Sequence, residues 1–207
     1  MKIFLTGATG GIGKSIKSFL EKKNIEVIDK GSKDIDLSKN FSLKKIKVNG
    51  LIHCAGINNP KTYKKVTYET LNHLFNINTF SFIELIKQLD FYPNSNIIAI
   101  GSLYSEYVKE LRLEYSMSKH ALNAAVKTLA LELAHDKVLV NMISPGFVDT
   151  PLTRKNLSDD ELKSLNEKIP LGLTSAESIS SFIHYMISNN KSITGQNIFI
   201  DNGYTLI

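Results

Sequence analysis

The strongest constraint on the fold is a regular alternation of short apolar runs with segments of helical periodicity. Each run has four to six residues, which is too short for a helix, and is apolar on both faces, as buried parallel strands are. The runs lie at 2–6, 25–28, 50–54, 96–100, 138–143 and 197–200. Helical spacing occurs at 12–23, 67–90, 115–135 and 175–189. The alternation predicts one α/β domain over residues 1–207, with a doubly wound parallel sheet that binds ligands at the carboxyl ends of its strands.

Composition excludes several other classes of protein. The chain has 207 residues, 43% hydrophobic and 22% charged, unlike a disordered, collagen-like or disulfide-rich chain. Residues 1–65 contain fourteen lysines and five acidic residues, a net charge of +9, and residues 66–207 carry −4. A basic half suggests an anionic partner, but lysines on solvated helix faces would give the same balance.

Cysteine content and hydropathy indicate where such a chain would reside. The single cysteine, Cys54, cannot form an internal disulfide, and the N-terminal residues lack the apolar run of a signal peptide. No stretch approaches the ~20 apolar residues of a membrane span. We therefore expect a cytoplasmic protein with no membrane segment. No set of His and Cys residues has metal-ligand spacing, so no catalytic metal is expected.

The glycine-rich turn after the first run admits two chemistries. Thr6–Ser15 follows a strand and opens a helix, so its backbone N–H groups and the helix dipole can hold a phosphate. Ala8–Ser15 (ATGGIGKS) is close to the phosphate loop of nucleotide hydrolases. That reading requires a Mg²⁺-binding Asp at the end of another strand, and the runs that end at Cys54 and Ile100 provide none.

The alternative chemistry is dinucleotide binding. Gly7, Gly11 and Gly13 would allow a tight turn, close approach to a pyrophosphate, and close packing of helix on strand. This reading requires an acidic residue about 20 positions later, at the end of the second strand. Asp29 is 22 residues after Gly7 and fits that requirement.

A candidate catalytic set follows in the second half of the chain. Tyr115 and Lys119 are four residues apart, on one face of a helix. A tyrosine of pKa about 10 is a poor acid-base at neutral pH, and a neighbouring ammonium lowers that pKa by favouring the phenolate. Ser102 lies just past the carboxyl end of a strand. It could polarise a substrate carbonyl while Tyr115 transfers a proton and a cofactor carries the hydride.

Seven segments with these features occur in a fixed order. They are TGATGGIG at 6–13, HCAG at 53–56, FNIN at 75–78, IGS at 100–102, YSMSK at 115–119, NMISPGFVDTP at 141–151 and ITGQNIFIDNG at 193–203. Together they resemble the short-chain dehydrogenase/reductase family, from residue 3 to about residue 203. The resemblance implies a Rossmann-like fold and an NAD(P)-dependent oxidoreductase that interconverts a small-molecule secondary alcohol and a carbonyl. It also implies a homodimer or homotetramer, with no nucleic-acid partner.

The resemblance also implies a role for individual residues. Tyr115 would be the general acid-base, Ser102 the substrate-polarising hydroxyl, and Lys119 both a ribose ligand and the charge that lowers the Tyr115 pKa. Asn78 would hold a proton-relay water near Lys119. The residues expected along the cofactor are Gly7, Thr9, Gly11, Ile12, Gly13, Asp29, Asp36, Leu37, Ala55, Gly56, Lys119, Pro145, Gly146 and Thr150.

Several alternatives stay open at this level. Ser102 and Thr150 could be helix caps, and Asn78 a polar residue that bends a helix. Cys54 is expected to be a buried thiol and not a nucleophile. A catalytically silent dinucleotide-binding sensor is the alternative to an enzyme. For an enzyme, the candidate substrates are 3-oxoacyl thioesters, sugars or nucleotide sugars, and steroids or small alcohols.

The chain departs from the family pattern in two connections. Only residues 30–33 separate the second run from a candidate third strand at Asp34–Leu37. A parallel crossover usually needs a dozen or more residues, so we expect no helix there and a more open adenosine side of the pocket. The segment after Pro151 is also short. Ser158 and Glu161 form a capping box, which predicts a helix from about residue 159 that acts as a lid.

Cofactor choice depends on the end of the second strand. The Asp29 carboxylate would accept hydrogen bonds from the ribose hydroxyls and repel a 2′-phosphate, which favours NAD. Lys30 and Lys33 follow directly and could bind a phosphate, so NADP is the alternative.

Overall fold

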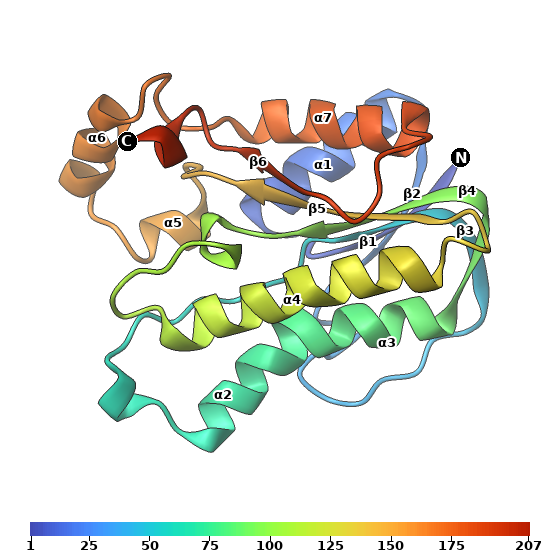
Figure 1. The fold of residues 1–207 in the computed structure, drawn as a ribbon, viewed down its shortest axis with the longest axis horizontal. Helices are drawn as coiled ribbons and strands as arrows, with labels where there is room; N and C mark the ends of the chain where they lie inside the picture. Colours follow the sequence, from blue (N-terminus) through green and yellow to red (C-terminus); the bar gives the residue numbers. More distant parts are fainter.

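The computed structural model describes residues 1–207 and places them around one six-stranded sheet (Figure 1). The strand order is β2-β1-β3-β4-β5-β6, and every pairing is parallel. The strands are β1 (Lys2–Thr6), β2 (Glu26–Lys30), β3 (Ile46–His53), β4 (Leu89–Ile100), β5 (Leu139–Pro145) and β6 (Asn197–Ile200). The predicted doubly wound parallel sheet is therefore confirmed, and each of the six apolar runs lies in or overlaps one of its strands.

Helices cover both faces of the sheet. They are α1 (Gly11–Lys22), α2 (Tyr68–Phe75), α3 (Ser81–Gln88), α4 (Leu113–Glu132), α5 (Pro151–Arg154), α6 (Asp159–Lys168) and α7 (Ala176–Asn189). A π-helical turn, Asn76–Phe80, joins α2 to α3. Short 3-10 turns lie at Tyr63–Lys65, Leu103–Ser105 and Tyr204–Leu206. None of the helices combines the length and apolar character needed to span a bilayer.

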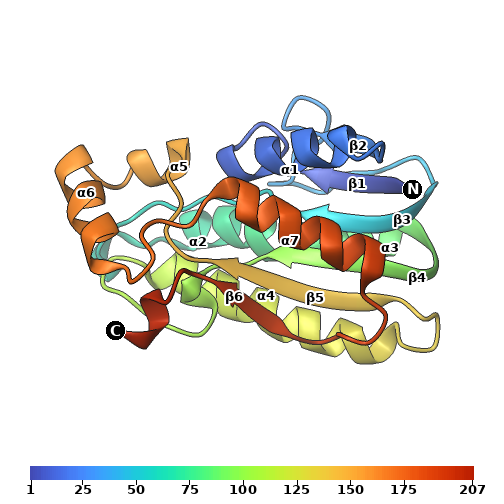
Figure 2. The ribbon, with the colours of Figure 1, turned by 90° about the horizontal axis from the view of Figure 1, so that it is seen from above.

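The sheet separates two hydrophobic cores. Helices α1 and α7 lie side by side over one face, where Ile16 and Ile183 pack in a cluster with Leu5 (Figures 1 and 2). Helices α3 and α4 cover the other face, where Phe82 and Leu122 pack in a second cluster. Because both faces are covered, the central strands contain apolar runs that are buried on both faces, such as residues 97–100 of β4.

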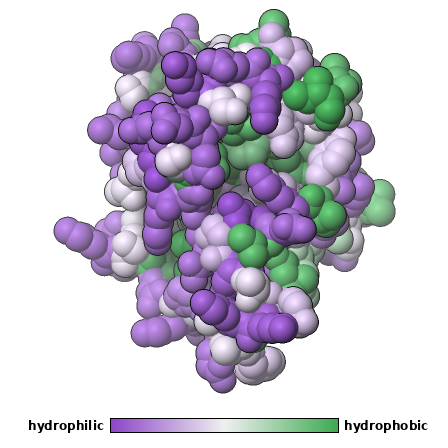
Figure 3. All heavy atoms as spheres, turned by 90° about the vertical axis from the view of Figure 1, so that its left-hand side faces the viewer, coloured by the Kyte–Doolittle hydropathy of each residue, from purple (hydrophilic) through white to green (hydrophobic).

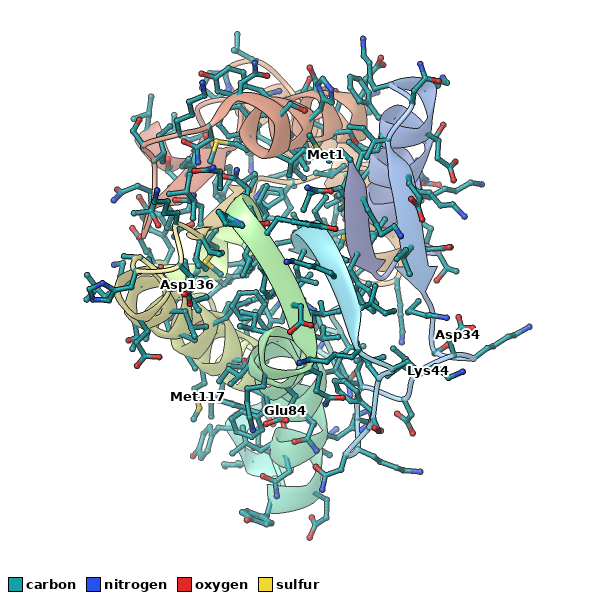
Figure 4. All side chains as sticks on the ribbon, turned by 90° about the vertical axis from the view of Figure 1, so that its right-hand side faces the viewer. Met1, Asp34, Lys44, Glu84, Met117 and Asp136 are labelled. Atoms are coloured by element: carbon teal, nitrogen blue, oxygen red, sulfur yellow. The ribbon has the colours of Figure 1, made fainter.

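The connection between β2 and β3, residues 31–45, contains no helix, as expected, but it also contains no strand. The predicted third strand at Asp34–Leu37 is wrong. Asp34 accepts a hydrogen bond from the Gly31 backbone N–H (3.0 Å), and Asp36 accepts one from the Ser38 backbone N–H (3.0 Å). These local side-chain bonds stabilise turns in place of an extended strand. Figure 4 shows Asp34 and Lys44 on this connection, beside the edge of the sheet.

One glutamine fastens this connection to α3. The Gln88 side chain accepts a hydrogen bond from the Leu43 backbone N–H (2.7 Å) and donates one to the Phe41 carbonyl oxygen (3.1 Å). Phe41 and Leu43 pack against the core beneath α3 and α4. The irregular connection therefore covers part of the sheet that a crossover helix would otherwise cover.

The carboxyl ends of the strands meet at the end of the molecule where α5, α6 and the C-terminus lie, on the left in Figure 1. Helix α6 begins with the predicted capping box, in which Ser158 and Glu161 bond each other's backbone N–H groups. Figure 3 shows this end from outside, with hydrophobic residues visible in a hollow near its middle and hydrophilic residues around it. A ligand that enters from solvent therefore reaches the strand ends here.

The core on the α3 and α4 side predicts a clear effect on stability. Phe82→Ala removes a fully buried ring and should lower the free energy of unfolding by about 3–5 kcal/mol, measured by urea denaturation. The control is Phe80→Ala, two residues earlier in the chain. The Phe80 side chain is 46% exposed, so its removal should lower the free energy of unfolding clearly less. Equal losses for the two variants would contradict this account of the core.

Candidate active site

The glycine-rich turn brings β1, α1 and β3 into close contact. Gly7 has a φ of 72°, in the left-handed region that glycine adopts without strain. A Cβ at Gly7 would lie 2.6 Å from the Ala55 backbone nitrogen, and one at Gly13 would overlap the Gly7 carbonyl oxygen. Larger residues are therefore excluded at both positions. Because no side chain is present at Gly7 or Gly13, the backbone N–H groups at the start of α1 are accessible to a ligand at the end of the sheet.

The end of β3 is held by a buried polar contact. The Thr6 hydroxyl lies 3.0 Å from Nδ1 of His53 and accepts a hydrogen bond from the Ala55 backbone N–H (3.3 Å). Burial lowers the pKa of His53 to about 3 and raises the pKa of the Cys54 thiol to about 12. The imidazole and the thiol are therefore both neutral at pH 7, which agrees with the expectation that Cys54 is not a nucleophile.

Two cavities open at the carboxyl ends of the strands. The first, called the Gly7 cavity here, lies between the glycine turn, the β2–β3 connection and the end of β3. Six predicted cofactor residues line it: Gly7, Thr9, Asp36, Leu37, Ala55 and Gly56. Lys30 and Ser32 line it as well, and no sequence pattern marks Ser32 as a site residue.

Asp29 is not brought to the Gly7 cavity. Its carboxylate accepts a hydrogen bond from Lys17 of α1 at 3.0 Å. Successive side chains of a strand point to opposite faces, so a strand that directs Asp29 toward α1 directs Lys30 the other way. The argument for NAD from an acidic residue at this strand end therefore loses its support, because Asp29 is paired with Lys17 and the charged residue of this strand end that lines the cavity is Lys30.

The second cavity, called the Tyr115 cavity here, contains the main candidate catalytic groups. Predicted residues that line it are Ile12, Ser102, Tyr115, Pro145, Gly146 and Thr150. It is completed by residues that sequence reasoning missed, among them Asn58, Tyr104, Lys109 and Arg112. Tyr104 packs edge-on against Tyr115, with ring centroids 6.1 Å apart. Ser102 and Tyr115, 13 residues apart in sequence, thus face one space.

Lys119 lies on α4 one turn after Tyr115 and is almost completely buried. Its Nζ donates a hydrogen bond to the Ile100 carbonyl oxygen (2.7 Å) and lies 5.9 Å from the centroid of the Tyr115 ring. Burial lowers the pKa of Lys119 to about 8. The lysine therefore links α4 to the end of β4, two residues before Ser102.

The expected lowering of the Tyr115 pKa by Lys119 is not what this structure shows. Burial raises the pKa of Tyr115, and the influences that oppose the rise are a hydrogen bond with Ser102 and the positive charge of Arg112. Lys119 is not among these influences, and its ammonium is bound to the Ile100 carbonyl oxygen. Arg112 had no role in the sequence-based prediction.

Asn78 lies in the π-helical turn between α2 and α3 and is fully buried. Its amide accepts a hydrogen bond from the Ile57 backbone N–H (2.9 Å) and donates to the Ile57 carbonyl oxygen (3.0 Å) and the Ser118 hydroxyl (3.0 Å). A Cβ on Gly56 would lie 3.5 Å from Oδ1 of Asn78 and 3.7 Å from Nζ of Lys119. Asn78 and Lys119 therefore both lie close to Gly56, and Asn78 belongs to the π-helical turn that joins α2 to α3.

Ser102 and Thr150 act as caps as well as lining the cavity. The Ser102 hydroxyl accepts a hydrogen bond from the Tyr104 backbone N–H (3.3 Å), and the Thr150 hydroxyl accepts one from the Thr153 backbone N–H (3.3 Å). The capping readings are thus correct for both residues. A hydroxyl has a second lone pair and a proton, so capping leaves each of them able to bind a ligand.

A polar network behind Ser102 was not anticipated. The Ser105 hydroxyl donates to the Ser102 carbonyl oxygen (2.6 Å) and lies 3.1 Å from the Ser144 hydroxyl. Asn197 of β6 accepts a hydrogen bond from Ser144 (2.6 Å) and donates one to Ser105 (3.0 Å). This network connects the segment after β4 with the carboxyl end of β5 and the first residue of β6, and no local sequence pattern marks its members. The structure places no group of three or more His, Cys, Asp or Glu residues so that it could hold a metal ion.

Comparison with known proteins agrees with this geometry. A family model described as enoyl-(acyl carrier protein) reductase matches residues 36–205. The 3-oxoacyl-[acyl-carrier-protein] reductase FabG of Buchnera aphidicola subsp. Schizaphis graminum is 30% identical, over 96% of this chain and 95% of the relative. FabG of Salmonella typhimurium is 26% identical, over 98% and 96% of the two chains.

Solved structures share the whole fold. A short chain dehydrogenase family protein from Francisella tularensis superposes with a TM-score of 0.86 at 27% identity, covering 100% of this chain and 99% of that one. The complex of 4-hydroxyisoleucine dehydrogenase with NADH gives a TM-score of 0.87 at 24% identity, with 100% of both chains covered. The chain belongs to the short-chain dehydrogenase/reductase family, whose members are oxidoreductases that act on CH–OH and C=O groups.

The buried ammonium of Lys119 predicts a pH effect on stability. Its pKa is about 8 in the fold and 10.5 in the unfolded chain, so the unfolded chain binds more protons between these values. Stability from this group is therefore lowest below pH 8 and rises by about 3 kcal/mol toward pH 10.5. The free energy of unfolding of the native chain minus that of Lys119→Met, from urea denaturation at each pH, should increase across this range. A flat difference would contradict it.

Proposed function

We propose that this protein is an NAD(P)-dependent enzyme that interconverts a secondary alcohol and a ketone, with Ser102, Tyr115 and Lys119 as its working residues. The observation that carries the proposal is that Ser102 and Tyr115 line one cavity, with Lys119 buried one helical turn from Tyr115. That cavity and the Gly7 cavity both open at the carboxyl ends of the strands, where a parallel α/β sheet binds its ligands.

The residues at the strand ends fit a dinucleotide. A Cβ at Gly7 or Gly13 would collide with backbone, so these glycines leave the start of α1 open to a phosphate. Gly7, Asp36, Leu37 and Ala55 would hold the adenosine and phosphate part, and Pro145, Gly146 and Thr150 the nicotinamide part. The bound nicotinamide supplies or accepts the hydride.

The protein's own groups handle the proton and the charge on oxygen. The Ser102 hydroxyl can donate a hydrogen bond to the substrate oxygen while Tyr115 gives that oxygen its proton, or removes it in the reverse direction. Tyr115 is protonated at neutral pH because burial raises its pKa, so it is ready to act as an acid in carbonyl reduction. In this proposal Lys119 and Asn78, whose polar atoms lie close to Gly56, hold the ribose and return protons from solvent.

The first substrate class to test is a 3-oxoacyl compound, because the relatives at 30% and 26% identity are named 3-oxoacyl-[acyl-carrier-protein] reductases. Sugar and small-alcohol substrates belong in the same assay panel. The reaction is followed by the change in nicotinamide absorbance.

Tyr115→Phe tests the mechanism. Losing the phenolic proton should lower kcat by about 10²–10⁴-fold, while the cofactor dissociation constant, measured by fluorescence titration, stays within a small factor. Tyr107→Phe, at a tyrosine that is 46% exposed, is the matched control and should keep full activity. Unchanged turnover in Tyr115→Phe would exclude this mechanism. A native protein that binds cofactor without turning over any panel member would indicate the silent sensor.

The charge that lines the Gly7 cavity also predicts a cofactor preference. Lys30, and not Asp29, lines the Gly7 cavity, and a lysine can bind the 2′-phosphate of NADP(H). We therefore expect NADPH to be used in preference to NADH. Lys30→Ala should raise the KM for NADPH about tenfold or more, the value of one hydrogen bond to a charged group, and change the KM for NADH little. Lys33→Ala, at a lysine outside the cavity lining, is the control. An unchanged KM for NADPH in Lys30→Ala would contradict the assignment.

A further inference from the structure

The wall of the Tyr115 cavity contains a guanidinium that the mechanism above does not use. Arg112 is one of two arginines in the chain and lies three residues before Tyr115, at the N-cap position of α4. Its side chain lines the cavity together with Ser102 and Tyr115. The preceding residue is fixed, because the Leu111 carbonyl oxygen accepts a hydrogen bond from the Lys61 backbone N–H (3.1 Å). Arg112 is thus held beside the groups proposed to act on the substrate.

Arg112 has no anionic partner in the protein. Its Nε is buried and forms no hydrogen bond, and no carboxylate lies within ion-pair distance of its guanidinium. The residues that line the cavity include no Asp or Glu. The nearest acid in sequence, Glu114, is bound by Lys61 at 2.9 Å and also accepts a hydrogen bond from Thr70.

The second cation of the cavity is differently placed. Lys109 lies close enough to Glu161 of α6 to contribute to the lowered pKa of that carboxyl. Arg112 is therefore the cation of this cavity for which the protein supplies no counter-charge.

An unpaired guanidinium is unfavourable at this position for two reasons. The Nε–H of the half-buried Arg112 is enclosed without an acceptor, and a buried donor that is left unpaired costs free energy. The N-terminus of a helix also carries a partial positive charge, so a cation there is repelled. An anion bound in the cavity would relieve both effects, since the guanidinium and the helix dipole attract the same charge.

We propose that Arg112 binds the carboxylate of an oxo acid, or of the corresponding hydroxy acid, whose carbonyl lies at Ser102 and Tyr115. This inference rests on the proposed function and narrows its substrate class. The planar guanidinium can bind a carboxylate with two parallel hydrogen bonds, which fixes the direction of the carbonyl as well as its distance. A thioester has no charge at that point, so the free acid is the expected substrate.

Arg112 has a possible second role, which the experiment must separate from the first. Its charge opposes the rise of the Tyr115 pKa that burial causes, and this effect would help every substrate equally. Binding of a carboxylate helps only acids. The informative quantity is therefore the ratio of kcat/KM for an acid to that for its neutral derivative.

The experiment uses matched sets of 2-oxo and 3-oxo acids, their methyl esters and their N-acetylcysteamine thioesters, each with both reduced cofactors. The native protein should prefer an acid to its ester by tenfold or more. Arg112→Gln should abolish that preference, mainly through a higher KM for the acid, and Arg112→Lys should restore part of it. Lys127→Gln, an exposed cation further along α4, is the control and should retain the full preference. Calorimetric titration of the acids and esters into cofactor-loaded protein provides a second readout, which does not depend on turnover.

The outcomes separate the two hypotheses. Equal use or binding of acid and ester by the native protein, or no binding of any acid, would overturn the role of Arg112. An equal loss on acid and ester in Arg112→Gln, with a shifted pH profile, would assign it to the Tyr115 pKa alone. Failure of the proposed function would appear differently, as normal turnover in Tyr115→Phe.

Discussion

The arrangement of the site depends on one hydrogen bond between two elements that meet at the edge of the sheet. Nζ of Lys119 donates to the Ile100 carbonyl oxygen, at the last residue of β4. The bond fixes the start of α4, and with it Tyr115, relative to the Ser102 segment that follows β4. Because the ammonium is buried, the bond also offsets part of the cost of removing this charge from water. Lys119 therefore joins α4 to β4 in the fold, in addition to its role in the proposed chemistry.

The parallel sheet explains why the contact between Lys119 and Ile100 lies at the proposed site. All six strands end at the same edge, so the turns after β1, β3, β4 and β5 meet there although they lie far apart in sequence. The hydroxyls of Thr6 and Ser102 each accept a hydrogen bond from a backbone N–H just beyond a strand, and Thr150 caps α5 in the segment after β5. Ser102 and Thr150 therefore fix the backbone of the segments after β4 and β5 and also line the Tyr115 cavity.

The short connection between β2 and β3 affects the periphery of the site and not its centre. Residues 31–45 pass from β2 to β3 without a helix, and Gln88 fastens them to α3. The sheet consequently ends at β2, and Lys30, Ser32 and Asp36 line the Gly7 cavity. The two halves of the proposed ligand site differ in how they are built. The Gly7 half is bordered by an irregular connection, and the Tyr115 half by a long helix and a network of buried hydroxyls.

The sequence by itself determined the six strands, the main flanking helices and the catalytic candidates, because apolar runs, glycine turns and the Tyr115–Lys119 spacing are local patterns. It also predicted a strand at Asp34–Leu37, where side-chain hydrogen bonds form turns instead. It did not determine which way a side chain at a strand end points. Asp29 and Lys30 are adjacent, and a single step along β2 decides which of them faces the cavity. The tertiary structure alone decided that Lys119 points to Ile100, that Ser105, Ser144 and Asn197 form one network, and that Arg112 lies beside Tyr115 without a counter-charge. Each of these depends on segments that only folding brings together.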